Sequence, residues 1–476
     1  MDIEQQSKNI HLMWRAGFGP RAGDLQSVSR FSSKELFASM VKASSKTPEY
    51  IRVSTNTLDG LWKGIVNEGR MQELSKEQKQ QIRKDSREAL KNLNIRWLDE
   101  MVHSDAQLRE KMAFFWHGHF ANREINIFFQ QKLLDILRRN ALGNFGNLLV
   151  EVSKSAAMLA FLNNQQNRKQ SPNENFAREV MELFTLGRGN YTEKDIKEAA
   201  RAFTGWGFDL GGEFVFRKQF HDSGTKTIFG KTGNFDGDDV IAMLLENRQT
   251  ANYITTKIFR FFVNDEPDTA IISTLSNNFY QSGYDIKKLM SGIFQSPWFY
   301  KQNNTGVKIK SPVELLVGIR RILPMDFERE EVQLLYQRLL GQILFYPPNV
   351  AGWPGGRNWI DSSSLMYRLR LPRLLQDDQE FSATPKDDDD VMMGQGNASK
   401  SLQRGRINVK VDWQAYTSVF KDIPRNDLPV SIAASLLQGG KVDLDLLNKY
   451  ADAGDRESYI RSVTINLMST PDYQLM

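Results

Sequence analysis

Apolar residues recur every three or four positions along most of this chain, the spacing that predicts amphipathic helices. Charged residues occupy the opposite face of each of these segments. The pattern therefore predicts a mainly α protein, with a large, irregular, multi-helical domain. We expect helices near residues 80–103, 105–117, 126–141, 173–186, 193–204, 310–323 and 328–343.

Four short sequences indicate where helices begin, because Ser or Thr is followed three residues later by Asp, Glu or Gln. This is the spacing of a capping box. Two of the four also carry Pro at the expected first helical position. Gly187 and Gly341 stand where a helix is expected to end or to pack closely. The predicted capping boxes are 104–107, 171–174, 192–195 and 311–314.

One stretch, residues 206–230, alternates as a strand does. After a Gly-Gly break at 211–212, Phe214 and Phe216 share one face of the expected strand. His221 then falls on the opposite, polar face. We predict a small antiparallel β-ribbon packed on helices.

The composition changes at residues 376–406, which contain an acidic run, Gly and Ser, and few residues that a core could bury. Such a composition favours a linker or a long loop. The predicted organisation is a motif-bearing helical domain at 1–375, this linker, and a small C-terminal helical region at 407–476.

Composition excludes several classes of function. Of the 476 residues, 40% are hydrophobic and 25% charged, as in soluble globular domains, and the net charge is only +5. Basic and acidic residues are interspersed, so we expect no nucleic-acid partner. No cysteine is present, which excludes disulfides and thiolate chemistry. G-x-G-x-x-G is also absent, so no nucleotide cofactor is indicated.

The same sequence predicts no transmembrane segment, because no run of about 20 apolar residues occurs. The amino terminus also lacks the apolar core of a signal peptide. The expected location is therefore the cytoplasm as the chain is written, or the periplasm or exterior if a leader was removed.

Histidine is scarce, with five in the chain, and four lie in motif-dense segments. These four are His11, His117, His119 and His221. In a continuous helix, His117 and His119 would point about 200° apart and could not hold one ion. If the helix ends at Gly118, the two imidazoles can turn toward each other. The alternative is that His117 caps the helix end and His119 continues an apolar stripe.

Glu179 and Glu182 lie one helical turn apart, where two carboxylates repel and require a cation, a shared proton or an arginine. Pairing of Arg178 with Glu182 is one solution. A divalent metal ion held by carboxylates and imidazoles is the other. The metal hypothesis takes His117, His119, Glu179, Glu182 and His221 as ligands. The corresponding catalytic residues would be Glu179, Glu182, His221 and Asp222, acting on a metal-activated water or as an acid–base centre.

A segment rich in Pro, Gly and Trp at 347–360, PPNVAGWPGGRNWI, predicts a rigid irregular loop. It is interpreted either as the wall of a pocket or as an aromatic plug between helices. In the first case its indoles would stack on a substrate, and nearby cations would contact an anion. The predicted substrate contacts are Arg178, Lys226, Trp353, Trp359 and Arg368.

Six sequence blocks carry a resemblance that covers nearly the whole chain. They are HLMWRAGFGP at 11–20, REKMAFFWHGHFA at 109–121, NENFAREVMELFTLGRGNYTEKDIKEAARAFTGW at 173–206, FHDSGTKTIFG at 220–230, IKSPVELLVG at 309–318 and GQILFYPPNVAGWPGGRNWI at 341–360. Together they resemble the bacterial family called domain of unknown function 1800. The residues that match the family's pattern are His117, His119, Arg178, Glu179, Glu182, His221 and Asp222.

The resemblance implies a role in the cell envelope or with extracellular polymers, since members of this family are often neighbours of proteins similar to sulfatases and alkaline phosphatases. Together with the candidate residues, it leaves two expected functions. One is a metal-dependent or His/carboxylate acid–base enzyme, for example a hydrolase. The alternative is a non-catalytic binding or maturation partner of a sulfatase-like companion protein.

Overall fold

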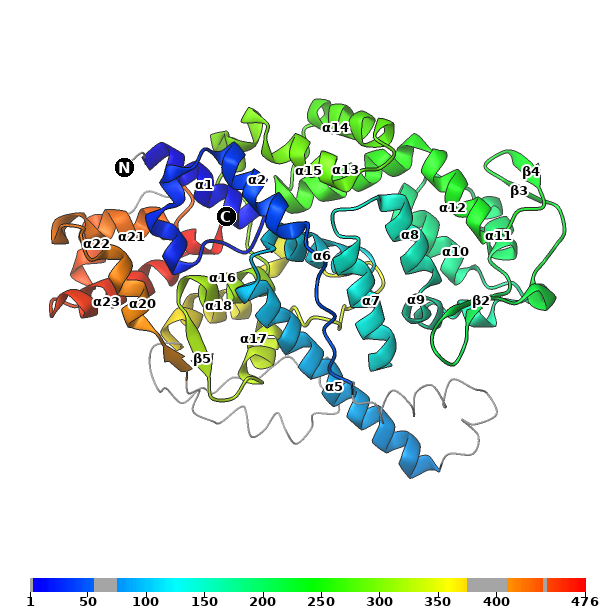
Figure 1. The fold of residues 1–476 in the computed structure, drawn as a ribbon, viewed down its shortest axis with the longest axis horizontal. Coiled ribbons are helices and arrows are strands. Elements are labelled where there is room, and N and C mark those ends of the chain that lie inside the picture. The colour runs from blue at the N-terminus through cyan, green and yellow to red at the C-terminus, as the bar shows by residue number, and fades with distance from the viewer. Residues whose placement is uncertain (1–2, 55–74, 375–408, 440–442) are drawn as a thin grey trace.

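Helices form most of the computed structural model, which describes residues 3–54, 75–374, 409–439 and 443–476 (Figure 1). The mainly α fold predicted from periodicity is confirmed, and all seven expected segments are helical. The predicted linker at 376–406 lies outside the described residues. Within them, no helix combines the length and the apolar character needed to cross a bilayer.

The first half of the helices runs from the N-terminus to the far end of the molecule, through the long α5 (Figure 1). Their bounds are α1 Ile3–Arg15, α2 Ser33–Ser44, α5 Lys76–His103, α6 Gln107–His119, α7 Ile127–Arg139, α8 Phe145–Lys154, α9 Ala156–Phe161, α10 Glu174–Met181 and α11 Glu193–Ala202.

The second half returns through the middle and ends beside α1. Its bounds are α12 Gly237–Glu246, α13 Arg248–Phe262, α14 Thr269–Gln281, α15 Ile286–Phe294, α16 Pro312–Ile322, α17 Val332–Leu340, α18 Ser362–Leu374, α20 Trp413–Thr417, α21 Leu428–Leu436, α22 Leu444–Lys449 and α23 Arg456–Met468.

The described strands form three antiparallel pairs. These are β1 Trp206–Phe208 with β2 Phe214–Phe216, β3 Lys226–Ile228 with β4 Lys231–Gly233, and β5 Met325–Phe327 with β6 Val409–Val411. The predicted ribbon is thus two hairpins, and a strand that continues to His221 is wrong. A single 3-10 turn, Lys218–Phe220, follows β2. It is held from both sides, because the Arg217 N–H donates to Gly205 O at 2.8 Å and the Lys169 N–H donates to Phe220 O at 2.8 Å.

Two of the four predicted capping boxes are confirmed, at Thr192 before α11 and at Ser311 before α16. The other two are wrong. Ser104 ends α5, so α6 begins after Ala106. Asn173 caps α10 in place of Ser171, because its side chain accepts the Asn175 N–H at 3.0 Å.

Replacing Thr192 by alanine tests the confirmed cap at α11. Its hydroxyl accepts the Asp195 N–H at 3.1 Å. Losing such an acceptor costs about 1 kcal/mol. We expect a slightly lower melting temperature by calorimetry and unchanged ligand binding. Thr192→Ser keeps the hydroxyl and is the matched control, and a loss of binding at unchanged stability would contradict the structural assignment.

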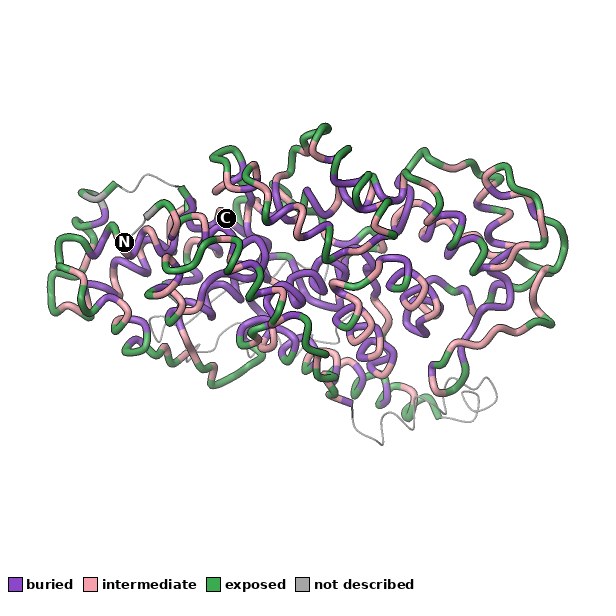
Figure 2. The backbone as a smooth tube through the Cα atoms, turned by 45° about the horizontal axis from the view of Figure 1, so that its top comes forward, coloured by how far each residue is buried: buried purple, intermediate pink, exposed green. Residues whose placement is uncertain are grey.

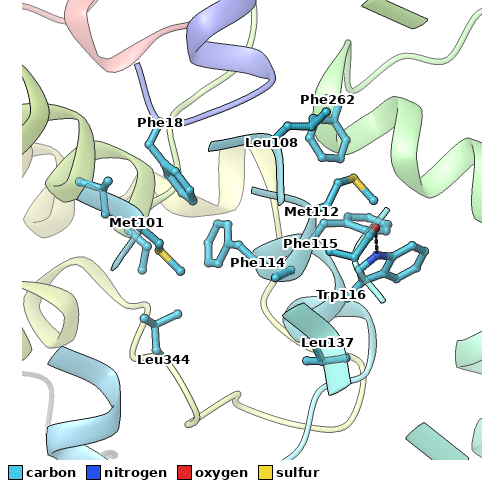
Figure 3. Packing of buried hydrophobic residues seen from close by; sticks show 14 of the residues in the cluster. Phe18, Met101, Leu108, Met112, Phe114, Phe115, Trp116, Leu137, Phe262 and Leu344 are labelled. Carbon is cyan, nitrogen blue, oxygen red and sulfur yellow. Dashed lines mark hydrogen bonds between the residues drawn. The ribbon is translucent and has the colours of Figure 1, made fainter. Parts of the chain in front are cut away.

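A continuous apolar core connects α1 with α23 and includes the helices between them (Figure 2). Helix α6 lies at its centre. Almost every one of its residues is buried, and Met112, Phe114, Phe115 and Trp116 spread in different directions from it (Figure 3). A helix that is buried on all sides, its charged residues included, must be surrounded by other parts of the chain. The central position of α6 therefore fixes where both of its histidines point.

The chain's last residues pack beside the segment that precedes α16. Met476 and Lys308 exchange backbone hydrogen bonds, and the Lys310 N–H donates to Gln474 O at 2.8 Å. Helix α21 contacts α1, and α23 contacts α18. The C-terminal residues consequently help to form the surroundings of the cleft described next.

Candidate functional site

A cleft of about 940 Å³ lies at the end of α6, where the last turn of α13, the start of α16 and residues 351–359 meet. Five phenylalanine and tryptophan residues contribute to its walls: Phe114 and Phe115 from α6, Phe261 from α13, and Trp353 and Trp359 from the Pro- and Gly-rich segment. The two indoles thus line a pocket, as the pocket-wall interpretation requires. Their contact with a substrate stays a prediction.

The Pro- and Gly-rich segment fits closely because glycine stands at two points of contact. Gly352 has a φ of +84°, and a Cβ there would lie 2.4 Å from the carbonyl oxygen of Gly118 on α6. Gly356 has a φ of +61°, and its Cβ would approach Asp265 Oδ2 to 2.9 Å. Only glycine allows both approaches. Trp353 and Trp359 are thereby held between this cleft and a second cavity of about 340 Å³.

Ion pairs occupy the inner wall of the cleft. Lys308 is buried and bonds to Asp265, and both line the cleft. Glu314, also in the lining, is buried and lies 2.5 Å from the ammonium of Lys111. Burial opposes ionisation of Glu314, but Lys111 and the cap at Ser311 hold the pKa of its carboxyl below the usual value. The two carboxylates are therefore committed to partners within the protein.

Glu314 also faces several other buried cations. It raises the pKa of Arg15, Lys310 and Arg368 against the lowering caused by burial. Arg368, predicted as an anion contact, is fully buried and donates to Lys310 O at 2.9 Å. It is not part of the cleft lining. The prediction for Arg368 is corrected accordingly, since its guanidinium is enclosed by the core and not presented to a ligand.

His117 is enclosed among Trp97, Phe345 and Trp353, with ring centroids 4.9–5.4 Å away. Its Nε2 accepts the Phe345 N–H at 3.0 Å. Phe345 has a φ of +65°, so this acceptor supports a strained backbone. Burial lowers the pKa of His117 to about 3. The ring is therefore neutral, and this nitrogen is occupied by a backbone bond.

His119 points away from His117, because α6 does not end at Gly118 but continues through His119. Its Nε2 donates to Phe184 O at 3.2 Å. Phe184 belongs to a π-helical turn, Glu182–Leu186, whose extra residue displaces its carbonyls from helical partners. Tyr253 donates to another of them, Leu183 O. The expected meeting of the two imidazoles is wrong for this geometric reason.

The carboxylates of α10 have partners other than those predicted. Arg178 bonds to Glu193 at 2.8 Å and to Glu174 at 3.2 Å, and not to Glu182. Glu182 instead accepts from Tyr191 and from Arg188, the latter at 3.0 Å.

Glu179, one turn before Glu182, is half-buried. Its pKa is raised by burial and, to a lesser degree, by the charge of Glu182. These groups form a salt-linked patch, and none of them lines the cleft. Their predicted catalytic and substrate-binding roles stay predictions.

His221, Asp222 and Lys226 form a third, separate cluster beside α11. His221 Nδ1 donates to Thr204 O at 3.0 Å. The Arg201 guanidinium, 2.7 Å from Asp222, lowers the pKa of that carboxyl. Lys226 donates to the carbonyl oxygen of Asp222 at 2.6 Å and is almost fully buried. The polar groups of this cluster therefore bind one another, and the Lys226 ammonium already donates to a backbone carbonyl.

The predicted metal ligands are therefore distributed over several places. Within the described ranges, which include all five, no group of three or more His, Asp or Glu side chains is arranged to hold one ion. The physical reason is local, since His117 and His119 bind backbone groups and Glu182 binds a tyrosine and an arginine. A divalent metal stays a prediction, and the five-ligand centre is not assembled.

Lys257 on α13 is a cleft residue that the sequence did not suggest. It lies one turn from Arg260 and Phe261, and nothing in its surroundings along the chain distinguishes it from a surface lysine. Among the residues that the structure describes, it has no hydrogen bond or ion pair, only the ring of Tyr253 5.5 Å away. Burial lowers the pKa of its ammonium to about 8. Its charge also lowers the pKa of His119, which lines the same cleft.

Comparison with known proteins gives one match. A family model described as "Protein of unknown function (DUF1800)" matches residues 11–475, nearly the whole chain. No curated protein and no solved structure matches it.

Proposed function

The chain belongs to the DUF1800 family of proteins of unknown function, and we propose that it binds a carbohydrate chain of an envelope or extracellular polymer in the cleft at the end of α6. The observation that carries the proposal is the pair of indoles, Trp353 and Trp359, on one wall of a large cleft that is otherwise rich in polar groups.

The mixed lining suits a ligand with both apolar faces and many hydroxyl groups. Aromatic faces pack against the C–H face of a sugar ring, while polar groups fix its hydroxyls. The exposed residues Asn303, Glu266 and Arg357 line the cleft and can form hydrogen bonds with such hydroxyls. A purely apolar ligand would cover these groups without pairing them, which is unfavourable.

The size of the cleft favours an oligomer over a single sugar. Pockets for drug-sized ligands span about 300–1,000 Å³, and this cleft of about 940 Å³ is near the upper limit. The second cavity, on the other side of Trp353 and Trp359, gives room for further units. Hydrolysis of the bound chain and service to a sulfatase-like companion stay predictions from the sequence.

Titration calorimetry with a panel of oligosaccharides tests the proposal. The panel should contain fragments of peptidoglycan, cellulose, mannan, galacturonan and alginate, each four to six units long. We expect at least one to bind, and Trp353→Ala to weaken that binding at least tenfold, which corresponds to about 1.4 kcal/mol. The indole contributes the stacking face that alanine lacks.

Two further variants make the result interpretable. Trp353→Ala loses the ring contact with His117 and could therefore be destabilised. Trp353→Phe keeps an aromatic ring at this position, and we expect it to retain most of the affinity. Tyr450→Ala removes an exposed aromatic side chain on the C-terminal region and should change nothing. If no member of the panel binds, or if Trp353→Ala binds as the parent does, the proposed function is refuted.

A further inference from the structure

The charges of the cleft do not cancel once the internal ion pairs are counted. Lys308 is paired with Asp265, and Glu314 with Lys111. Among the described lining residues, this leaves three cations, Lys257, Arg260 and Arg357, and a single carboxylate, Glu266, without an ion-pair partner. The free part of the lining is thus positive.

Lys257 differs from the other two cations in its surroundings. Arg260 and Arg357 are exposed to solvent, which screens their charge. Lys257 is half-buried at the cleft wall, close to His119, and its ammonium meets no acceptor among the described residues. An ammonium has three N–H donors, and a charge with reduced hydration and no partner is unfavourable.

His119 cannot supply the missing negative charge. Its Nε2–H is engaged with Phe184 O, and its buried Nδ1 has no hydrogen-bond partner among the described residues. Tyr253 presents a ring face to Lys257, while its hydroxyl bonds to Leu183 O. Glu266, the free carboxylate, lies in the turn after α13 and is exposed. Among the described residues no group accepts from Lys257, so a ligand or solvent supplies its acceptor.

From this arrangement, which rests on the proposed function, we infer that the cleft selects acidic saccharides and that Lys257 contacts the ligand's anionic group. The chemistry that satisfies the ammonium is an oxyanion carried on a sugar ring, a carboxylate or a sulfate. Such an anion receives charge-assisted hydrogen bonds, and their strength grows in a partly enclosed cleft. Arg260 and Arg357 at the rim attract the same ligand over a longer range.

Matched pairs of oligosaccharides test this inference by calorimetry on the full chain. Oligogalacturonate is compared with its methyl ester, which lacks the free carboxylates, and a chondroitin sulfate oligomer with its desulfated form, which keeps its carboxylates. We expect the acidic member of at least one pair to bind at least tenfold more tightly. The pair that responds identifies whether carboxylate or sulfate is the anion.

Variants of Lys257 assign the preference to this residue. Lys257→Gln should abolish most of the tenfold preference by weakening acidic ligands and leaving the neutral counterpart unchanged. Lys257→Arg should retain the preference. Lys194→Gln, on the exposed face of α11, changes the net charge equally and should have no effect.

The outcomes separate the two proposals. If acidic and neutral members bind equally well, charge selection is wrong and carbohydrate binding stands. If the preference survives Lys257→Gln, the assignment to Lys257 is overturned. If no oligosaccharide binds, acidic or neutral, both proposals fail.

Discussion

Replacing Glu314 by glutamine is expected to lower the free energy of unfolding by about 3–5 kcal/mol, the typical cost of removing one partner from a buried ion pair. The carboxylate is 2.5 Å from the ammonium of Lys111, and both side chains are almost fully buried. Urea unfolding monitored by circular dichroism measures the change.

The effect is large because Glu314 faces more than one cation. Burial lowers the pKa of Lys111, Lys310, Arg15 and Arg368, and Glu314 opposes that lowering at each of them. Without the carboxylate these groups must lose their protons or remain charged without compensation, and both choices are unfavourable because the side chains are buried.

A double variant separates the ion pair from packing. Lys111→Met together with Glu314→Gln removes the ammonium as well, and we expect it to be more stable than Glu314→Gln alone. The matched control is Glu4→Gln, which breaks the exposed pair between Glu4 and Lys8 and should cost less than about 1 kcal/mol. Equal costs for Glu314→Gln and Glu4→Gln would contradict the assignment.

Acid should destabilise this protein in the range in which free histidine gains a proton. Burial lowers the pKa of His11, His117 and His119, the second to about 3. In the unfolded chain each has a pKa near 6.5. Below that value the unfolded state binds more protons than the folded state, so acid favours unfolding.

The stability contributed by these neutral rings is complete above about pH 6.5 and is lost as the pH falls through their lowered pKa values, that of His117 being about 3. Each ring contributes a slope of up to about 1.4 kcal/mol per pH unit, so that three together approach about 4 kcal/mol per unit. Urea unfolding at intervals between pH 7.5 and pH 4.5 measures the slope.

Single variants apportion this slope. His117→Gln offers a carboxamide oxygen to the Phe345 N–H. It should reduce the pH dependence of the unfolding free energy by up to about 1.4 kcal/mol per pH unit, the contribution of one ring. His103→Gln replaces an exposed histidine at the end of α5 and is the control, with no expected change. A slope that His117→Gln leaves untouched would show that this ring already carries a proton in the folded protein.

Much of the fold could be read from the sequence because helices depend on near neighbours. Periodicity along the chain located all seven expected helices, and the capping boxes at Thr192 and Ser311 formed where their spacing predicts them. The same local reasoning failed at Ser171, because Asn173 offers an equally good cap closer to the helix.

The site could be predicted only in part. The composition of segment 347–360 indicated a rigid loop with two indoles, and Trp353 and Trp359 do line the cleft. Lys257 and Glu314 carried no such signal, since one resembled a surface lysine and the other completed a helix cap. Their importance arises because segments distant in sequence bring both of them to the same cleft.

The two histidines of α6 show what the sequence determines and what only the tertiary structure decides. The sequence by itself determined that a helix reaches His117, and it left open whether that helix continues to His119. Only the tertiary structure decided that α6 continues past Gly118, because Gly352 packs against the Gly118 carbonyl and the core encloses the helix on every side. A continuous helix turns the two rings apart, and each then binds the backbone of a different segment. Helix formation depends on residues three and four apart, whereas the partner of a buried polar group depends on which distant backbone reaches it.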